Sequence, residues 1–81
     1  MAYGFVLIRT APGKEKSVII KLLSKKVVRE IHTVFGEYDI VALMTARDYQ
    51  GLGQKIIDNI RSIEGVEDTM TLAGCKLKGM P

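Results

Sequence analysis

Cysteine, histidine and tryptophan are nearly absent from this chain of 81 residues, which has one cysteine (Cys75), one histidine (His32) and no tryptophan. A single cysteine excludes an internal disulfide, and we expect a reducing, cytoplasmic setting. Metal sites of the zinc type need several thiolate or imidazole ligands at recognisable spacing, so we expect no metal. Nucleophilic catalysis through Cys75 would require His32 within reach as its base. We interpret His32 as a surface or cross-strand contact and Cys75 as an inert thiol.

Long apolar runs and blocks of one charge are also missing. No run approaches the roughly 18 apolar residues that a bilayer-spanning helix needs, and no basic segment precedes the apolar N-terminus as in a signal peptide. We therefore expect no membrane association. The net charge is +3, but the 12 basic residues are dispersed among 9 acidic ones. No basic cluster is dense enough for a nucleic-acid arm, so we expect no direct DNA binding.

Apolar residues are plentiful for so short a chain. They make up 47% of the sequence, whereas a domain of this length has only a small core. We expect one domain over residues 1–81, with a short basic tail from about residue 74. The excess of apolar side chains indicates self-association.

Six secondary-structure elements are predicted from the spacing of apolar and turn residues. Strands are expected where short runs of β-formers lie between turn residues, and helices where apolar residues recur at three- and four-residue spacing. The predicted strands cover residues 3–9, 28–35, 40–45 and 66–72, and the predicted helices cover residues 13–25 and 48–65.

The predicted helices have recognisable ends. Pro12 suits the first turn of the first helix, because its missing N–H is not needed there. Asp48 is a good N-cap for the second helix, and Gly65 is placed to end it in the left-handed conformation. The expected buried stripes are Val18, Ile19, Leu22 and Leu23 on the first helix, with Ile20 pointing away, and Tyr49, Leu52, Ile56, Ile60 and Ile63 on the second.

The order β-α-β-β-α-β is the split βαβ pattern, so we predict an α+β, ferredoxin-like fold. Right-handed crossovers place both helices on one face of an antiparallel sheet. The central strands, residues 3–9 and 40–45, are apolar on both faces, and the chain has no third layer for the open face. Such a face indicates an association surface. We predict a homodimer packed sheet to sheet, or a higher closed oligomer.

The turn Gly36-Glu37-Tyr38-Asp39 contains the first candidate ligand-binding group. Gly36 accepts a positive φ, as a hairpin requires. Asp39 opens the apolar run of the following strand, where a bare carboxylate would lose its hydration. Its carboxylate either closes the turn by bonding the backbone or lies at a cleft to meet a ligand cation.

Two hydroxyls on the last predicted strand are the second candidate group. Alternation places Thr69 and Thr71 on the same face. They either simply suit a polar strand face or bind a ligand carboxylate or amide. Together with Asp39 they could recognise a small zwitterion, because an ammonium group needs a carboxylate and a carboxylate needs donors.

The sequence gives little support for a catalytic site or a phosphate-binding site. Gly51 and Gly53 resemble part of a phosphate-binding turn, but Ile56 stands where a third glycine would be, and the pair does not directly follow a strand. An acid–base site would have to use His32, Tyr38 or Asp39, and no convincing pair is present. We expect no catalytic residues and no cofactor.

Three segments carry a resemblance to a known family. They are Ala11-Pro12-Gly13, the stretch from Val28-Arg29-Glu30-Ile31-His32 through Val34-Phe35-Gly36-Glu37-Tyr38-Asp39, and residues 60–71, Ile-Arg-Ser-Ile-Glu-Gly-Val-Glu-Asp-Thr-Met-Thr. The Gly-Glu-Tyr-Asp turn followed by Gly-Val and Thr-x-Thr is a fairly specific combination. Over about residues 3–73 the chain resembles the effector-binding domain of the Lrp/AsnC transcription regulators, the RAM domain (regulation of amino-acid metabolism).

The resemblance implies the same β-α-β-β-α-β fold, dimers packed through their sheets, and dimers assembled into a ring, often an octamer. It implies that a small amino acid binds between dimers, with residues 36–39 as the turn and Thr69 and Thr71 on the facing strand. In this interpretation Asp39 meets the ammonium group of the ligand, and a threonine hydroxyl meets its carboxylate or side chain.

Full-length members of that family carry an N-terminal helix-turn-helix, whereas this chain begins at the first predicted strand. We therefore expect a stand-alone effector domain that senses amino acids or co-assembles with full-length regulators. The alternatives are an oligomerisation subunit that binds no ligand and a small dimeric α/β enzyme. An ACT domain has the same element order, but its ligand typically lies near the loop after the first strand, here residues 10–13 with no acid.

Overall fold

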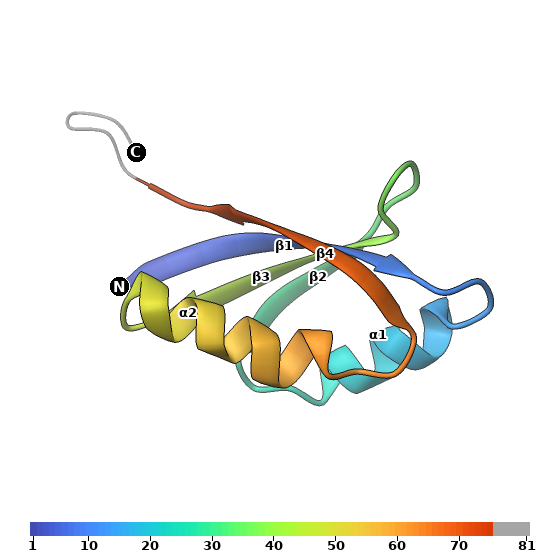
Figure 1. The fold of residues 1–81 in the computed structure, drawn as a ribbon, viewed down its shortest axis with the longest axis horizontal. Coiled ribbons are helices and arrows are strands. Elements are labelled where there is room, and N and C mark those ends of the chain that lie inside the picture. Colours follow the sequence, from blue (N-terminus) through green and yellow to red (C-terminus); the bar gives the residue numbers. More distant parts are fainter. Residues whose placement is uncertain (76–81) are drawn as a thin grey trace.

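The computed structural model describes residues 1–75 and contains one four-stranded antiparallel sheet and two helices, the second of which continues into a π-helical turn. The elements are β1 (Ala2–Thr10), α1 (Glu15–Leu23), β2 (Val28–Thr33), β3 (Ile40–Ala46), α2 (Tyr49–Ile56), η1 (Ile57–Arg61) and β4 (Val66–Ala73). The strand order is β2-β3-β1-β4, and both helices lie on one face of the sheet (Figure 1). The predicted ferredoxin-like fold is confirmed.

Most of the predicted basic tail, residues 76–81, lies outside the described part of the chain. Within residues 1–75, no helix is both long and apolar enough to span a bilayer.

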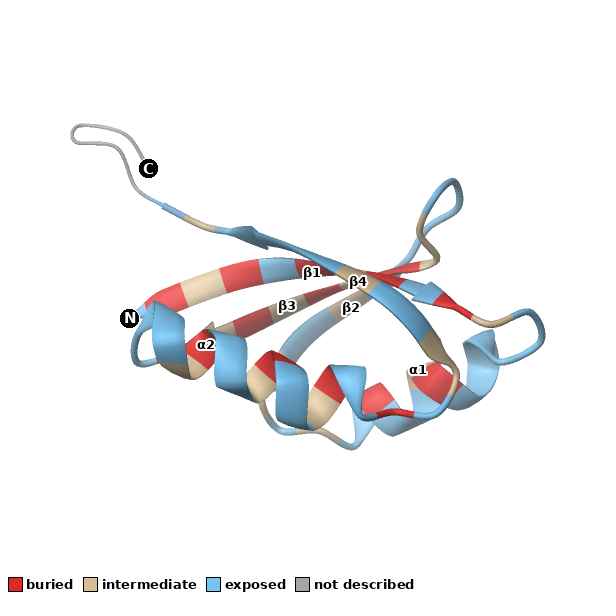
Figure 2. Ribbon diagram, in the orientation of Figure 1, coloured by how far each residue is buried: buried red, intermediate tan, exposed pale blue. Residues whose placement is uncertain are grey.

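The core lies between the helices and the face of the sheet that they cover (Figure 2). Along β1 and β3 every second residue points at the helices and is buried, as strand alternation requires. The fully buried side chains of this layer are Val6 and Ile8 on β1, Ile40, Ala42 and Met44 on β3, and Val18, Leu22 and Ile60 on the helices.

The buried stripe of α1 is narrower than predicted. Val18 and Leu22 are buried and Ile19 packs against them, but Leu23 is 70% exposed. Because α1 has only nine residues and ends at Leu23, this side chain lies on the solvent side of its last turn. Ile20 is exposed, as predicted.

The loop before α1 also differs from the prediction. Lys14 N donates to Ala11 O at 2.9 Å, and Gly13 has a φ of +82°. Proline followed by a left-handed glycine is typical of a type II turn. Pro12 therefore belongs to this turn and not to the helix, which begins at Glu15.

Asp48 caps α2 as predicted. Its Oδ1 accepts a hydrogen bond from Gly51 N at 2.7 Å. Tyr49, which was predicted to be in the buried stripe of this helix, is exposed. It lies at the N-terminal end of the helix, where its hydroxyl donates to Gly74 O.

The other face of the sheet is uncovered and apolar. Phe5, Met70 and Leu72 are 41%, 48% and 53% exposed. Two rows of side chains cross β3, β1 and β4 in register, Leu43–Phe5–Leu72 and Val41–Leu7–Met70. We call these six residues the open-face patch. An ion pair between Arg9 and Asp68, at 2.9 Å, borders it at one end.

Gly65 lies in the turn after the second helix and packs against the start of α1. The helix itself ends at Arg61, and Gly65 follows in a turn with a φ of +103°, so its predicted left-handed conformation is confirmed. Its O accepts from Ala11 N at 2.8 Å. A Cβ at this position would lie 2.9 Å from Lys14 Cβ and 3.0 Å from Val18 Cγ2.

We expect Gly65→Ala to destabilise the fold. A left-handed conformation costs an L-residue roughly 1–2 kcal/mol, and overpacking adds about 1–3 kcal/mol. The free energy of unfolding in urea should therefore fall by about 2–5 kcal/mol. Gly53→Ala is the matched control, because a Cβ there meets nothing within 4 Å and alanine in a helix gains up to about 1 kcal/mol. Equal stability of the two variants would contradict this account of Gly65.

Candidate functional site

The loop between β2 and β3 projects beyond the sheet on the side away from the helices (Figure 1). Val34 N donates to Asp39 O at 2.9 Å and closes the loop. Phe35, which was predicted to end the strand, instead belongs to the loop and is 99% exposed. Gly36 has a φ of +132°, which confirms the positive φ predicted for this turn. Glu37, the next residue, is exposed.

The carboxylate of Asp39 is fixed at the end of β1. Its Oδ2 accepts from Thr10 N at 2.8 Å and from Thr10 Oγ1 at 3.1 Å, and Asp39 N donates to Ile8 O at 2.9 Å. Thr10 is buried beside a break in the strand register, so the carboxylate satisfies a backbone N–H and a hydroxyl that the sheet does not. Both bonds use Oδ2, and no donor within residues 1–75 meets Oδ1.

Tyr38 ties the base of the hairpin to the rest of the sheet. The Arg9 guanidinium lies over its ring, 5.8 Å from the centroid, and the same guanidinium pairs with Asp68 of β4. Tyr38 is half-buried. The base of the loop is therefore held by Asp39 and Tyr38.

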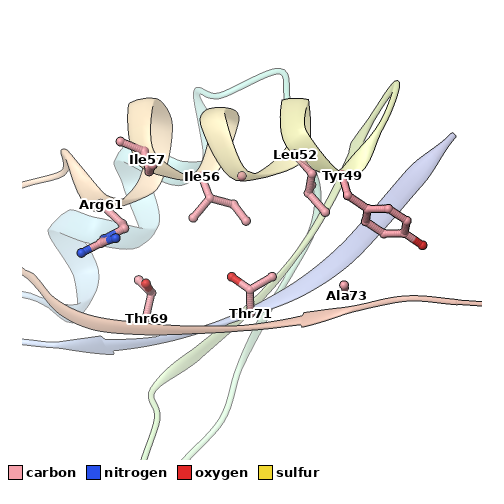
Figure 3. Close-up of a pocket in the computed structure, with 9 residues that line it drawn as sticks. Tyr49, Leu52, Ile56, Ile57, Arg61, Thr69, Thr71 and Ala73 are labelled. Atoms are coloured by element: carbon pink, nitrogen blue, oxygen red, sulfur yellow. The ribbon is translucent and has the colours of Figure 1, made fainter.

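A pocket of about 390 Å³ opens on the helix side of the sheet, between the second helix and the edge strand β4 (Figure 3). Thr69 and Thr71 pair with Ile8 and Val6, whose side chains are buried under the helices, so both threonines face the helix side. The alternation predicted for this strand is confirmed. The lining residues are Tyr49, Leu52, Gly53, Ile56, Ile57 and Arg61 of the helix and Thr69, Thr71 and Ala73 of β4.

The π-helical turn Ile57–Arg61 shapes one end of this pocket. Such turns are rare, and they occur mostly as single bulges in α-helices, frequently at functional sites. Asn59 Nδ2 donates to Lys55 O at 2.9 Å, which adds a side-chain donor to the backbone ladder at the turn. The first and last residues of the turn, Ile57 and Arg61, both line the pocket.

Arg61 is the only charged residue that lines this pocket within the described part of the chain. It also lines a smaller, more polar pocket of about 240 Å³ beside it, together with Val66, Glu67, Asp68 and Thr69. Arg61 takes part in none of the ion pairs or side-chain hydrogen bonds found in residues 1–75. The guanidinium is therefore available to a ligand in either pocket.

The predicted site residues fall into two groups. Thr69 and Thr71 line the pocket, whereas none of residues 36–39 does. The hairpin projects from the opposite side of the sheet (Figure 1). A joint role of the two groups in ligand binding stays a prediction, and it requires a hairpin from another copy of the chain.

The sequence-based reasoning did not find Arg61 or the apolar wall of the pocket. Arg61 was one of 12 dispersed basic residues with no pattern of its own. The available signal was Ile57, an apolar residue outside the stripe predicted for the second helix, which lies on the pocket wall.

His32 and Cys75 lie away from the pocket. His32 Nε2 is 3.1 Å from Glu30 Oε1 on the exposed surface of β2, in agreement with the predicted surface contact. Cys75 is exposed and unpaired among the described residues. In the same part of the chain, no group of three or more His, Cys, Asp or Glu side chains is placed to hold a metal ion.

Comparison with known sequences gives one family. The model of the Lrp/AsnC ligand binding domain matches residues 4–73. An uncharacterised helix-turn-helix transcriptional regulator of Pyrococcus furiosus is 35% identical over 72 residues, which cover 85% of this chain and 48% of the regulator. The chain thus spans about half the length of the curated relatives that it matches.

Solved structures agree with this. A protein of Thermus thermophilus is 34% identical, with a TM-score of 0.86, and the match covers 95% of this chain and 96% of that one. AsnC of E. coli is 25% identical, with a TM-score of 0.87, and the match covers 99% of this chain and 54% of AsnC. The fold, the sequence resemblance and the family model agree, and the chain belongs to the Lrp/AsnC ligand-binding domain family.

Proposed function

We propose that this chain is a module that binds a small amino acid and forms oligomers, and that it modulates transcription either by sensing the effector or by co-assembling with full-length Lrp/AsnC regulators. The observation that carries the proposal is the pocket between the second helix and β4, in a domain of a ligand-binding family. The relatives that support the regulatory role are helix-turn-helix transcriptional regulators. Because its relatives are regulators, we place the protein in the cytoplasm. Because its basic residues are dispersed among acidic ones, we assign this domain no DNA contact of its own.

The first part of the proposal is a dimer through the open-face patch. A two-fold axis brings the same patch of both subunits together, and contiguous exposed apolar side chains support an interface there. Polar pairs frame the patch, with Arg9–Asp68 at one end and Glu30–His32 along β2. These polar pairs limit how the second copy can be placed, because its apolar rows must meet the apolar rows of the first copy and not the charged side chains.

We expect Leu72→Glu to dissociate the dimer. Leu72 lies at the β4 end of the patch's first row, beside Phe5, and a carboxylate buried there would have no partner. Sedimentation equilibrium should show a dissociation constant raised about 100-fold, which is about 2.7 kcal/mol. Leu23→Glu, on the exposed side of α1, is the matched control and should leave the assembly unchanged. An unchanged assembly in Leu72→Glu would place the dimer interface on another face.

The second part is the ligand site between copies. The pocket opens on the helix side, opposite the face that the dimer uses, so we place the hairpin that completes it on a neighbouring dimer. Dimers joined in this way form a closed ring, for example an octamer. Asp39 Oδ1 is an acceptor for a ligand ammonium group, and the hydroxyls of Thr69 and Thr71 are donors for a carboxylate. Gly36, Glu37 and Tyr38 present the hairpin to the neighbouring copy.

Ligand binding by this fold has a precedent. A transcriptional regulator of Neisseria meningitidis with the same fold, at 16% identity and a TM-score of 0.82, was solved as a complex with L-methionine. A 44-residue match, 43% identical, to a homocitrate synthase of Sulfurisphaera tokodaii spans only 9% of that enzyme. The regulators therefore support a non-enzymatic role for this chain more broadly than the enzyme supports a catalytic one.

Asp39→Ala should cost stability even without a ligand. It leaves the N–H and the hydroxyl of Thr10 buried without their acceptor. Leaving buried donors unsatisfied costs about 1–3 kcal/mol, and urea unfolding should show a loss of this size. Asp39→Asn keeps an acceptor oxygen and should lose less. If Asp39→Ala is as stable as the wild type, the bonds to Thr10 do not hold the hairpin.

The ligand role of Asp39 is tested with Asp39→Asn, because this variant removes the charge and keeps an acceptor for Thr10. A thermal-shift screen of the twenty amino acids against the wild type should give one or a few that raise Tm. A ligand at 100 times its Kd adds about 2.7 kcal/mol, which corresponds to several degrees in a domain of this size. The shift should be lost in Asp39→Asn and kept in Glu15→Gln, an exposed control on α1. A stable oligomer with no shift for any amino acid would instead indicate a subunit that acts by assembly alone.

A further inference from the structure

We propose that Arg61 anchors the carboxylate of the ligand, and that the pocket selects small carboxylates with an aliphatic side chain. This inference rests on the proposed function in placing the ligand in the pocket between the second helix and β4. It adds the group that holds the negative charge and the class of molecule that the pocket accepts.

The position of Arg61 carries the first step. It is the last residue of η1, it lines both the larger and the smaller pocket, and it has no ion-pair partner within residues 1–75. Figure 3 shows its guanidinium at one end of the larger pocket, on the same side as Thr69. A guanidinium offers a planar fork of donors that matches the two oxygens of a carboxylate. The Thr69 hydroxyl can add a donor from the strand side.

The remaining wall sets the class of ligand. Leu52 and Ile56 form the buried floor, and Ile57 and Ala73 line the sides. These side chains offer contacts to an aliphatic group and no hydrogen bond. A volume of about 390 Å³ lies within the usual range of small-molecule pockets. A carboxylate at Arg61 therefore directs an aliphatic side chain along the floor toward Tyr49.

The charge of the pocket lining fits the carboxylate end of an amino acid and not its ammonium end. No carboxylate among the described residues lines this pocket, so a ligand ammonium group finds no partner in a single chain. Its partner, Asp39, comes from another copy in the proposed assembly. The carboxylate end is thus recognised within one chain and the ammonium end between chains, and analogues that lack one end should distinguish the two contributions.

Glu67 allows a second test of whether Arg61 binds an anion. It lines the smaller pocket with Arg61, yet the two are not within ion-pair distance. Its negative charge opposes an anion bound at Arg61. Glu67→Gln removes that charge while keeping the shape of the side chain, so it should strengthen carboxylate binding, whereas a purely structural role of Arg61 predicts no change.

The experiment uses three probes that share one carbon skeleton: L-leucine, its des-amino analogue 4-methylpentanoate and its decarboxylated analogue isopentylamine. Ligand-observed NMR titration of the oligomeric protein gives the Kd of each. We expect both carboxylates to bind the wild type and isopentylamine to bind more weakly than either, because it lacks the group that Arg61 holds and keeps only the contact with Asp39 of another copy. Arg61→Gln should weaken both carboxylates at least 10-fold, and Arg61→Lys should weaken them less. Asp39→Asn should weaken L-leucine and leave 4-methylpentanoate unchanged.

The outcomes separate this inference from the proposed function. If Arg61→Gln binds both carboxylates as tightly as the wild type, Arg61 is not the anchor, although amino-acid sensing stands. If 4-methylpentanoate binds through Arg61 and L-leucine does not bind, the anchor is supported and sensing of this amino acid is rejected. If neither carboxylate binds the wild type, the inference is overturned. The thermal midpoint of each Arg61 variant without ligand should equal that of the wild type, because Arg61 has no partner within residues 1–75.

Discussion

A sheet that is apolar on both faces, in a chain that supplies helices for only one of them, is the constraint on which the rest of this structure depends. β1 lies between β3 and β4 and contributes Val6 and Ile8 to the covered side and Phe5 and Leu7 to the other. Water cannot be excluded from both sides by one chain of this length. The fold therefore has a complete core on one side and an uncovered apolar face on the other, and the proposed dimer rests on the same pattern that produces the core.

The same two-layer arrangement determines where a small molecule can enter. The second helix packs over β3 and β1 and only partly covers the edge strand β4, so the pocket forms where the helix layer ends. Thr69 and Thr71 are polar residues on the helix-facing side of a strand, a position that would be unfavourable in a closed core. Their presence is consistent with a wall that is left open to a polar ligand.

Features set by neighbouring residues could be predicted from the sequence. The N-cap at Asp48, the positive φ of Gly36 and the alternation that places Thr69 and Thr71 together depend on a few adjacent residues. Features that depend on contacts between distant residues could not be predicted from the sequence. The Asp39 carboxylate bonds Thr10, 29 residues earlier in the chain, and not the backbone of its own turn, so no local pattern predicted its partner.

Side-chain environments at the helix ends were the least predictable. The helical spacing of Leu23 and Tyr49 matches that of the buried stripes, yet both side chains are exposed, because Leu23 is the last residue of α1 and Tyr49 the first of α2. Arg61 joined the candidate site only because a π-helical turn brings it to the pocket, and helix propensity does not encode such a turn.

That turn makes the chemistry of the pocket depend on the backbone geometry of a helix as well as on its residues. A π-helical turn is equivalent to an α-helix with one inserted residue, and each residue of an α-helix advances by about 100° around the axis. Because the wider turn absorbs that extra residue, a shorter segment with regular helical geometry would keep the guanidinium at the pocket, whereas regular geometry with all five residues kept would rotate it about 100° away from Thr69. The approach of Arg61 to the pocket therefore depends on a local irregularity of the backbone, and a substitution that straightens the helix far from the lining would remove the guanidinium without changing any lining residue.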